Sequence, residues 1–119
     1  MKIKTSELTG AALDWAVSLI TNPDWSEEDR AANTYRYFDS GVCVDDPYTP
    51  SVDWSQGGPI IEREGIAVRR SYNMEQGDWQ AIRDGFKNNQ NGPTPLIAAM
   101  RCFCASKLGE EVEVPNEVS

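Results

Sequence analysis

The fold is decided by the stretch Gly92-Pro93-Thr94-Pro95-Leu96-Ile97-Ala98-Ala99-Met100-Arg101-Cys102-Phe103-Cys104-Ala105-Ser106-Lys107-Leu108-Gly109. Thr94 is a preferred helix N-cap, Pro95 suits the first turn, and Gly109 suits the position just after the last turn. Nearly every side chain between these signals is apolar. The stretch therefore predicts a central helix that other elements cover on more than one side. The exception is Arg101, a charge in the middle of an apolar surface.

A second helix is predicted near the start of the chain, after a short strand at residues 1–4. It begins between Thr5 and Thr9, both plausible caps, and ends at Asn22-Pro23. Its apolar stripe faces the interior, and Asp14 and Ser18 mark its solvent side.

The middle of the chain is polar and rich in turn residues. Ser26 to Arg30 predicts a short helix that carries Tyr35 and Phe38. Residues 42–44 predict a short strand, and residues 45–50 a loop, because two prolines in four positions interrupt strand pairing.

Glycine and proline residues mark the predicted turns and helix ends in the second half of the chain. Gly57-Gly58 predicts a turn, Pro59 begins a short helix, and Gly65 ends it. Residues 66–70 predict a strand whose antiparallel partner, residues 79–83, follows a turn at 73–77; a helical start at 79–83 is the alternative. Residues 85–92 predict a polar loop, and residues 110–115 an acidic surface tail.

These elements indicate an α+β fold, in which a small antiparallel sheet packs with a long C-terminal helix and a shorter N-terminal helix. The 119 residues suffice for a single domain over 1–119, with a short acidic tail from about 110. A homo-oligomer is also expected, because the C-terminal helix is more apolar than so small a domain readily covers.

Composition narrows the classes of function. The net charge is −8 and the isoelectric point about 4.4, so direct nucleic-acid binding is not expected, whereas a basic protein surface would be attracted. The chain has no histidine, which removes histidine-dependent nucleophiles and zinc sites and makes an enzyme less expected. Cys43, Cys102 and Cys104 are predicted as reduced thiols. No catalytic residue, metal ligand or cofactor is predicted, and with neither a leader nor a spanning segment we expect a cytoplasmic, non-membrane protein.

Arg101 has two interpretations. A buried cation needs a partner, which would be Glu62, Glu64 or Asp14 in an internal ion pair. Alternatively it binds an anion together with Thr94, which lies nearly two turns earlier on the same helix face.

The segment around Trp54 is the second candidate for ligand contact. Gly57 and Gly58 would let the backbone approach a ligand, and Trp54 would stack on a ring; alternatively the segment is a tight turn anchored by Trp54. Arg69-Arg70 is expected at a solvated strand edge, and Glu62-Arg63-Glu64 at a solvated helix surface.

Three segments resemble the phage NinX family, which is defined by a domain of unknown function. They are Met1-Lys2-Ile3-Lys4-Thr5-Ser6-Glu7-Leu8 with Ala12-Leu13-Asp14-Trp15-Ala16-Val17, then Asp53-Trp54-Ser55-Gln56-Gly57-Gly58-Pro59-Ile60-Ile61-Glu62, and Gly92-Pro93-Thr94-Pro95-Leu96-Ile97-Ala98-Ala99-Met100-Arg101-Cys102 through Lys107-Leu108-Gly109. The resemblance implies a small protein of temperate phages and prophages, and it implies no established activity.

Three functional hypotheses follow. The first is a non-enzymatic accessory protein that binds a small anionic, nucleotide-like ligand, and so sequesters a host signalling nucleotide. Its ligand-binding residues would be Trp54, Gln56, Gly57, Gly58, Thr94 and Arg101. The second is an acidic interaction module that inhibits or redirects a host or phage enzyme. A third, less expected, is a histidine-free enzyme acting on a nucleotide or a sugar.

Overall fold

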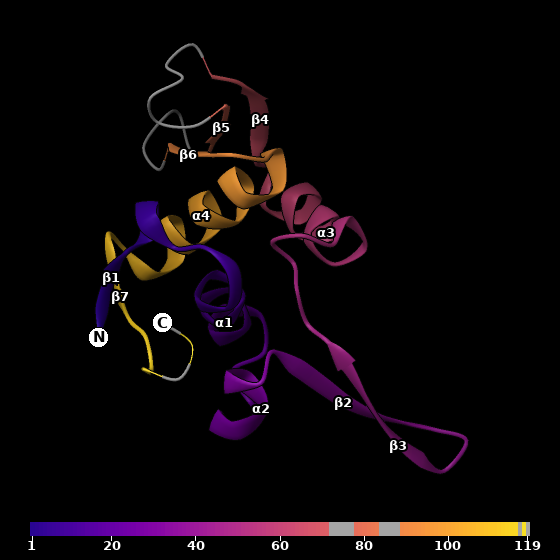
Figure 1. Ribbon diagram of the computed structural model, residues 1–119. Coiled ribbons are helices and arrows are strands. Elements are labelled where there is room, and N and C mark those ends of the chain that lie inside the picture. The colour runs from indigo at the N-terminus through magenta and orange to yellow at the C-terminus, as the bar shows by residue number, and fades with distance from the viewer. Residues whose placement is uncertain (72–77, 84–88, 117, 119) are drawn as a thin grey trace.

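A computed structural model describes the backbone of residues 1–71, 78–83, 89–116 and 118, and their side chains except those of residues 35–39 and 43–45. The predicted α+β class is confirmed (Figure 1). The elements in chain order are β1 (Lys2–Lys4), the 3-10 helix η1 (Thr5–Glu7), α1 (Gly10–Thr21), α2 (Glu27–Ala31), β2 (Thr34–Asp39), β3 (Val42–Pro47), α3 (Trp54–Glu64), β4 (Ala67–Arg70), β5 (Trp79–Ile82), β6 (Gln90–Gly92), α4 (Pro95–Leu108) and β7 (Glu111–Glu113).

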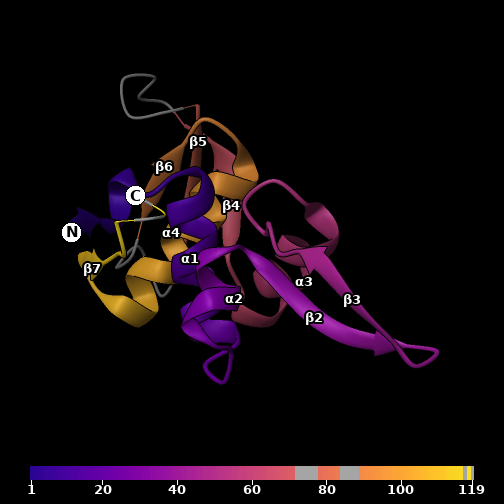
Figure 2. The same cartoon turned by 60° about the horizontal axis from the view of Figure 1, so that its bottom comes forward.

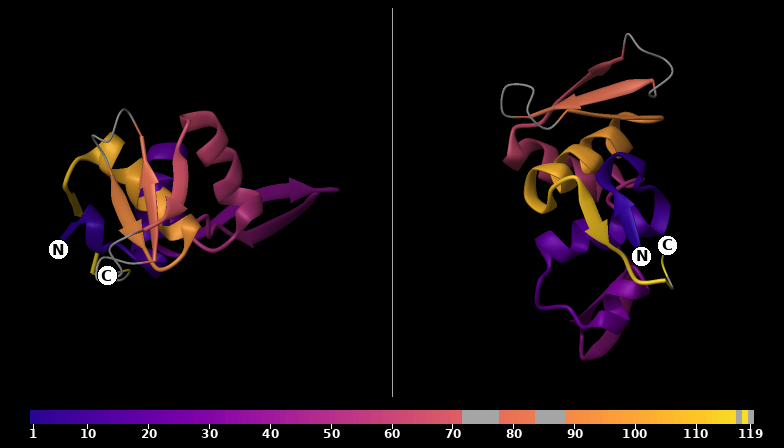
Figure 3. Two further views of the ribbon diagram at one scale, coloured as in Figure 1. Left: turned by 90° about the horizontal axis from the view of Figure 1, so that it is seen from above. Right: turned by 90° about the vertical axis from the view of Figure 1, so that its left-hand side faces the viewer.

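Helix α4 has the predicted bounds and the predicted central position. The Thr94 hydroxyl accepts a hydrogen bond of 3.1 Å from the Ile97 amide, which caps the helix, and Gly109 follows the last turn with a φ of +90°. The sheet of β4, β5 and β6 packs on one side of α4, and α1, α3 and η1 pack on other sides (Figure 3). Elements of the same chain therefore cover α4, and its burial does not require a second copy.

The three-stranded sheet confirms one prediction and corrects another. Strands β4 and β5 pair antiparallel as predicted, while the turn predicted at 73–77 lies outside the described residues. The predicted polar loop at 85–92 was wrong at its end, because Gln90–Gly92 pairs with Trp79–Ala81 as strand β6. A side chain at Gly92 would place its Cβ 2.8 Å from the Ala98 amide nitrogen. The glycine therefore lets β6 lie directly against α4.

Helix α1 ends at Asn22 as predicted, but its predicted solvent side was wrong. Asp14 is only 4% exposed and Ser18 only 1%. Each polar group has a partner inside the chain: the Ser18 hydroxyl donates to the Trp15 carbonyl, and the Asp14 carboxylate accepts from the Ser51 amide. Hydrogen bonds made inside the chain replace the solvent that the pattern had implied.

The β2–β3 hairpin differs most from the prediction. Ser26 caps a short helix, α2, as expected, but Tyr35 and Phe38 lie in strand β2 and not on that helix. The predicted loop at 45–50 was wrong in its first half, because β3 continues to Pro47, opposite Thr34. Proline is tolerated there because it lies at the strand end. The hairpin extends away from the helical body (Figure 2).

The acidic C-terminal segment is a strand and not a surface tail. Glu111–Glu113 pairs antiparallel with Lys2–Lys4, so the two ends of the chain lie side by side. Successive side chains of a strand point to opposite faces, so Val112 is buried while the flanking glutamates are exposed.

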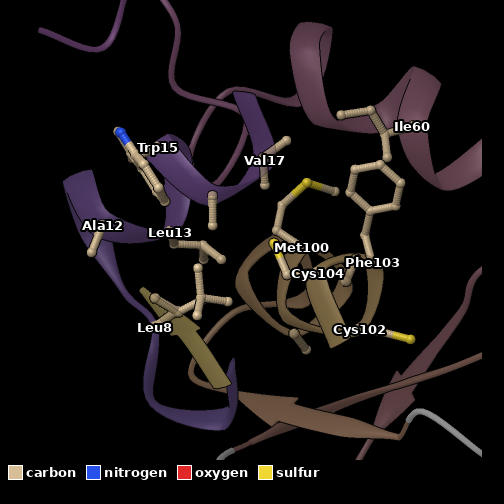
Figure 4. Packing of buried hydrophobic residues seen from close by; sticks show 14 of the residues in the cluster. Leu8, Ala12, Leu13, Trp15, Val17, Ile60, Met100, Cys102, Phe103 and Cys104 are labelled. Carbon is tan, nitrogen blue, oxygen red and sulfur yellow. The ribbon is translucent and has the colours of Figure 1, made fainter. Parts of the chain in front are cut away.

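The hydrophobic core lies between α1, α3 and α4 (Figure 4). Leu13 and Val17 of α1 pack toward Met100 and Phe103 of α4, and Ile60 of α3 closes the far side. Among the described residues, no helix is both long and apolar enough to cross a membrane.

Candidate functional site

The segment around Trp54 is helical, which corrects the predicted turn. Helix α3 begins at Trp54 and not at Pro59, because Asp53 caps it: the Asp53 carboxylate accepts hydrogen bonds from the Ser55 amide at 2.9 Å and the Ser55 hydroxyl at 2.6 Å. Pro59 lies inside the helix, where it removes one main-chain hydrogen bond on an exposed face. Gly65 ends the helix in the left-handed conformation, as predicted.

Gly57 is where α3 and α4 meet. A side chain at Gly57 would place its Cβ against the Pro50 carbonyl oxygen and 2.6 Å from Cδ1 of Leu96. Gly58, in contrast, has no atom nearer than the Trp54 ring at 4.0 Å. Gly57 therefore allows close helix packing, and neither glycine is required by a left-handed turn.

Gln56 holds the connection that precedes α3. Its Oε1 accepts a hydrogen bond of 2.6 Å from the Thr49 amide, and its Nε2 donates one of 2.9 Å to the Pro47 carbonyl. Gln56 also lines a pocket of about 280 Å³ with Asn22, Trp25 and Tyr48, on the side of α3 that faces the hairpin. Both ends of its amide are used inside the chain.

Trp54 and Thr94 come together in a separate pocket. It has a volume of about 260 Å³ and is lined by Ser51, Val52, Trp54, Thr94 and Leu96. Trp54 is 56% exposed and Val52 is 69% exposed, so two large apolar side chains face solvent beside this hollow. We call these five residues the Trp54 face. They join two segments that are 40 positions apart in the sequence.

Asp14 forms a hydrogen bond to Ser51 of the Trp54 face, a role that the sequence did not predict. Its carboxylate accepts a 2.9 Å hydrogen bond from the amide of Ser51, which is 1% exposed. Burial raises the pKa of Asp14, and the hydrogen bond from the Ser51 amide partly opposes the rise. The signal in the sequence was a carboxylate flanked by the apolar residues Leu13 and Trp15.

Arg101 lies on another side of α4. It follows Leu96 by five positions, which is about 140° around a helix. Its Nε donates to the Leu8 carbonyl at 2.7 Å, and its Nη1 donates to the Asn91 carbonyl at 2.8 Å. Burial lowers its pKa. Arg101 is not among the described residues that line the pocket of Trp54 and Thr94.

Two of the three predicted ion-pair partners of Arg101, Asp14 and Glu64, bind other groups. Glu64 pairs with Arg63 and Arg83 at 3.2 Å and with Lys107 at 3.4 Å. Burial raises the pKa of Glu64, but these cations outweigh that effect and lower it overall. Among the described residues, no carboxylate lies within ion-pair distance of Arg101, which is held by main-chain carbonyls instead.

A sequence comparison decides the family. The model of the family described as Bacteriophage P22, NinX matches residues 4–107. The chain belongs to this phage NinX family. No curated protein matches the chain. The matched residues of this NinX protein include the Trp54 face, Asp14 and Arg101, and they end just before β7.

Two arginines of this NinX protein lie on strand β4, and two of its cysteines are buried. Arg69 donates to the Gln80 amide oxygen, and the Arg70 guanidinium lies 5.2 Å from the centre of the Trp79 ring, both on exposed strand β4. Cys102 and Cys104 are buried thiols, and burial raises the pKa of Cys104. Cys43 has no described side chain. In the part of the chain that the structure describes, no cluster of acidic and cysteine residues could hold a metal ion.

Proposed function

We propose that this phage protein is an interaction module, and that it binds a host or phage protein through the Trp54 face. The proposal rests on the exposure of Trp54 and of Val52 beside it. Tryptophan is among the residues that contribute most to protein–protein binding, because it buries a large apolar surface with few rotatable bonds.

The pocket beside Trp54 has the size of a partner's side chain. Its volume of about 260 Å³ lies below the range of about 300–1,000 Å³ that is usual for sites of small molecules. The Asp14–Ser51 hydrogen bond, the Asp53 cap and the Gly57 contact hold its walls in place. A preorganised surface loses less conformational entropy when a partner binds.

Charge supports a basic partner. The net charge of −8 attracts positively charged protein surfaces and raises their rate of encounter with this one.

The nucleotide hypothesis has less support from this geometry. It requires Trp54 and Arg101 to hold one ligand, but Arg101 binds two carbonyls on another side of α4, and no cationic side chain is among the described residues that line the pocket. A nucleotide bound to the Trp54 face would therefore lack a counter-charge.

Photocrosslinking in phage-infected cells tests the proposal. A benzophenone side chain at position 54 is expected to crosslink one defined protein. The same group at position 42, where Val42 is also exposed, is not expected to crosslink that protein. The crosslinked protein is then purified, and Trp54→Ala is expected to weaken its binding at least about tenfold, since a central tryptophan contributes about 2 kcal/mol or more. Val42→Ala is the matched control.

Two outcomes contradict the proposal. One is equal crosslinking from positions 54 and 42. The other is calorimetry in which a nucleotide binds the wild-type protein, Trp54→Ala removes that binding, and no protein partner is found.

A further inference from the structure

The β2–β3 hairpin forms a two-stranded sheet of its own, which projects from the helical body (Figure 1, Figure 2). Among the described residues, no third strand pairs with it, and α2 is the only element outside the hairpin that contacts either strand extensively. A two-stranded hairpin is at best marginally stable in water unless a further strand or a packed element supports it. A strand added along one edge would therefore stabilise this hairpin.

The two ends of the hairpin show which main-chain groups face outward. At the base, the Tyr48 amide donates a 2.6 Å hydrogen bond to the Asn33 carbonyl. At the tip, Ser40 and Gly41 have φ values of +53° and +83°, as a two-residue type I′ turn requires. In an antiparallel ladder, pairs that exchange hydrogen bonds alternate with pairs whose main-chain groups point away from each other. Every second residue of β2, beginning with Thr34, therefore directs its main-chain N–H and C=O to the free edge.

The free edge of β3 resists pairing with a further strand. By the same alternation, Asp45 and Pro47 direct their main-chain groups to that edge. Proline has no N–H to donate, and Asp45 with Asp46 gives this strand two adjacent negative charges. Proline and charged residues on an edge strand are means by which natural proteins prevent edge-to-edge pairing.

The free edge of β2 has no such block. The strand contains no proline, and its two charged residues, Arg36 and Asp39, have opposite signs. Its other residues are threonine, tyrosine and phenylalanine, which favour strands. An edge without net charge offers little attraction to a strongly basic segment, but two copies of it can meet without local repulsion.

We propose that the free edge of β2 pairs antiparallel with the same edge of a second copy of this chain, so that two hairpins form one four-stranded sheet. The two-fold axis lies at Tyr37, which is opposite Tyr37 of the second copy. Arg36 is then opposite Phe38 of the second copy, and each such pair exchanges two main-chain hydrogen bonds. This surface is distinct from the Trp54 face, and it gives the expected homo-oligomer a route that does not involve α4.

Charge and strand length select this register. A register centred on Arg36 would place two arginines directly opposite each other, which is destabilising. A register centred on Phe38 would pair a shorter part of the strand, since β2 ends at Asp39. The register centred on Tyr37 opposes no like charges and uses most of β2.

Disulfide trapping in the full chain tests the register. Opposite residues of a pair without main-chain hydrogen bonds have Cα atoms about 4.5 Å apart, which is within the range for a disulfide. In a Cys43→Ser background, Tyr37→Cys is therefore expected to form a covalent dimer under mild oxidation. Val44→Cys replaces the residue that pairs with Tyr37 inside the hairpin, so it is the matched control on β3 and should stay monomeric.

Proline substitution tests the main-chain contacts. Arg36→Pro removes an outward N–H, whereas Arg36→Ala removes the same charge and keeps the N–H. Sedimentation equilibrium over about 10–500 µM, a range suited to a weak interface, measures self-association. Arg36→Pro is expected to associate at least about tenfold more weakly than Arg36→Ala, because each dimer loses two hydrogen bonds. Asp45→Pro, at the position opposite Arg36 in the hairpin, should not weaken association.

Salt distinguishes a second copy from a basic partner. Two chains with a net charge of −8 repel each other, so raising the salt concentration from about 0.05 to 0.5 M should strengthen self-association. Contact with a basic protein should weaken under the same change.

Three results would overturn the inference: a wild-type protein that is monomeric at every concentration and salt, equal trapping of Tyr37→Cys and Val44→Cys, or equal association of Arg36→Pro and Arg36→Ala. If Arg36→Pro does not fold, the trapping of Tyr37→Cys still decides the question.

Discussion

The main-chain amide of Ser51 donates a hydrogen bond of 2.9 Å to Oδ1 of Asp14, 37 positions earlier in the chain. Both residues are almost completely buried. Ser51 directly precedes Val52 and lies two positions before Asp53, the cap of α3. A single buried carboxylate on α1 therefore holds the segment that presents the Trp54 face.

Asp14→Ala should destabilise the protein by about 1–3 kcal/mol, because it leaves the Ser51 amide buried without an acceptor. Asp14→Asn should cost less, since its amide oxygen can still accept the same hydrogen bond. Urea unfolding of both variants at pH 7 measures the two values. An Asp14→Ala protein as stable as Asp14→Asn would show that the Ser51 hydrogen bond contributes little.

The Asp14 carboxyl also predicts a pH dependence. Burial raises its pKa above the ordinary value of 3.8, so the folded state holds this proton more tightly than the unfolded chain does. Its contribution to stability therefore decreases as the pH rises from 3.8 through the raised pKa, and is constant above it. The free energy of unfolding of Asp14→Asn, relative to wild type, should increase across the same interval. Parallel pH profiles for the two proteins would contradict this assignment.

Gly57 and Gly58 form a matched pair. Gly57→Ala should destabilise the protein by about 1–3 kcal/mol, because the added Cβ meets the Pro50 carbonyl and the Leu96 side chain. Gly58→Ala should stabilise it by about 0.5–1 kcal/mol, since alanine favours a helix more than glycine does and the nearest atom is 4.0 Å away. Thermal unfolding of the two variants should shift in opposite directions. Shifts of the same sign would refute the contact at Gly57.

Arg101→Lys should destabilise the protein by about 1–3 kcal/mol. A single ammonium group cannot reproduce the fork that reaches both Leu8 and Asn91, so at least one buried carbonyl loses its donor. Arg63→Lys, at a position that is 59% exposed, should change stability by less than about 0.5 kcal/mol. Denaturant unfolding compares the pair, and hydrogen exchange at Asn91 should report a loosened β6.

Thr94→Ala should cost about 1 kcal/mol, because the Ile97 amide loses its capping hydroxyl. Thr94→Ser keeps that hydroxyl and should be nearly neutral. Both variants leave the apolar groups of Leu96 and Trp54 in place, so unfolding curves separate the cap from the packing of the pocket.

Local signals predicted most of the helices. The cap at Thr94, the glycine ends at Gly65 and Gly109, and the stop at Asn22-Pro23 act on neighbouring backbone groups, so the residue types alone reveal them. The predicted start of α3 at Pro59 was wrong because the Asp53 cap begins the helix at Trp54, and the helix continues through Gly57 and Gly58. The strands at 90–92 and 111–113 were missed because a short polar segment becomes a strand only when a distant partner offers its main chain.

The candidate site also has features that depend on single residues and features that depend on distant contacts. The sequence by itself determined that Arg101 needs a partner, that Trp54 offers an aromatic surface and that Thr94 caps a helix, because charge, aromatic surface and capping ability belong to individual side chains. Only the tertiary structure decided that Trp54 and Thr94 share a pocket while Arg101 binds Leu8 and Asn91. Main-chain carbonyls are present at every residue, so no sequence pattern indicates which of them a half-buried guanidinium will reach.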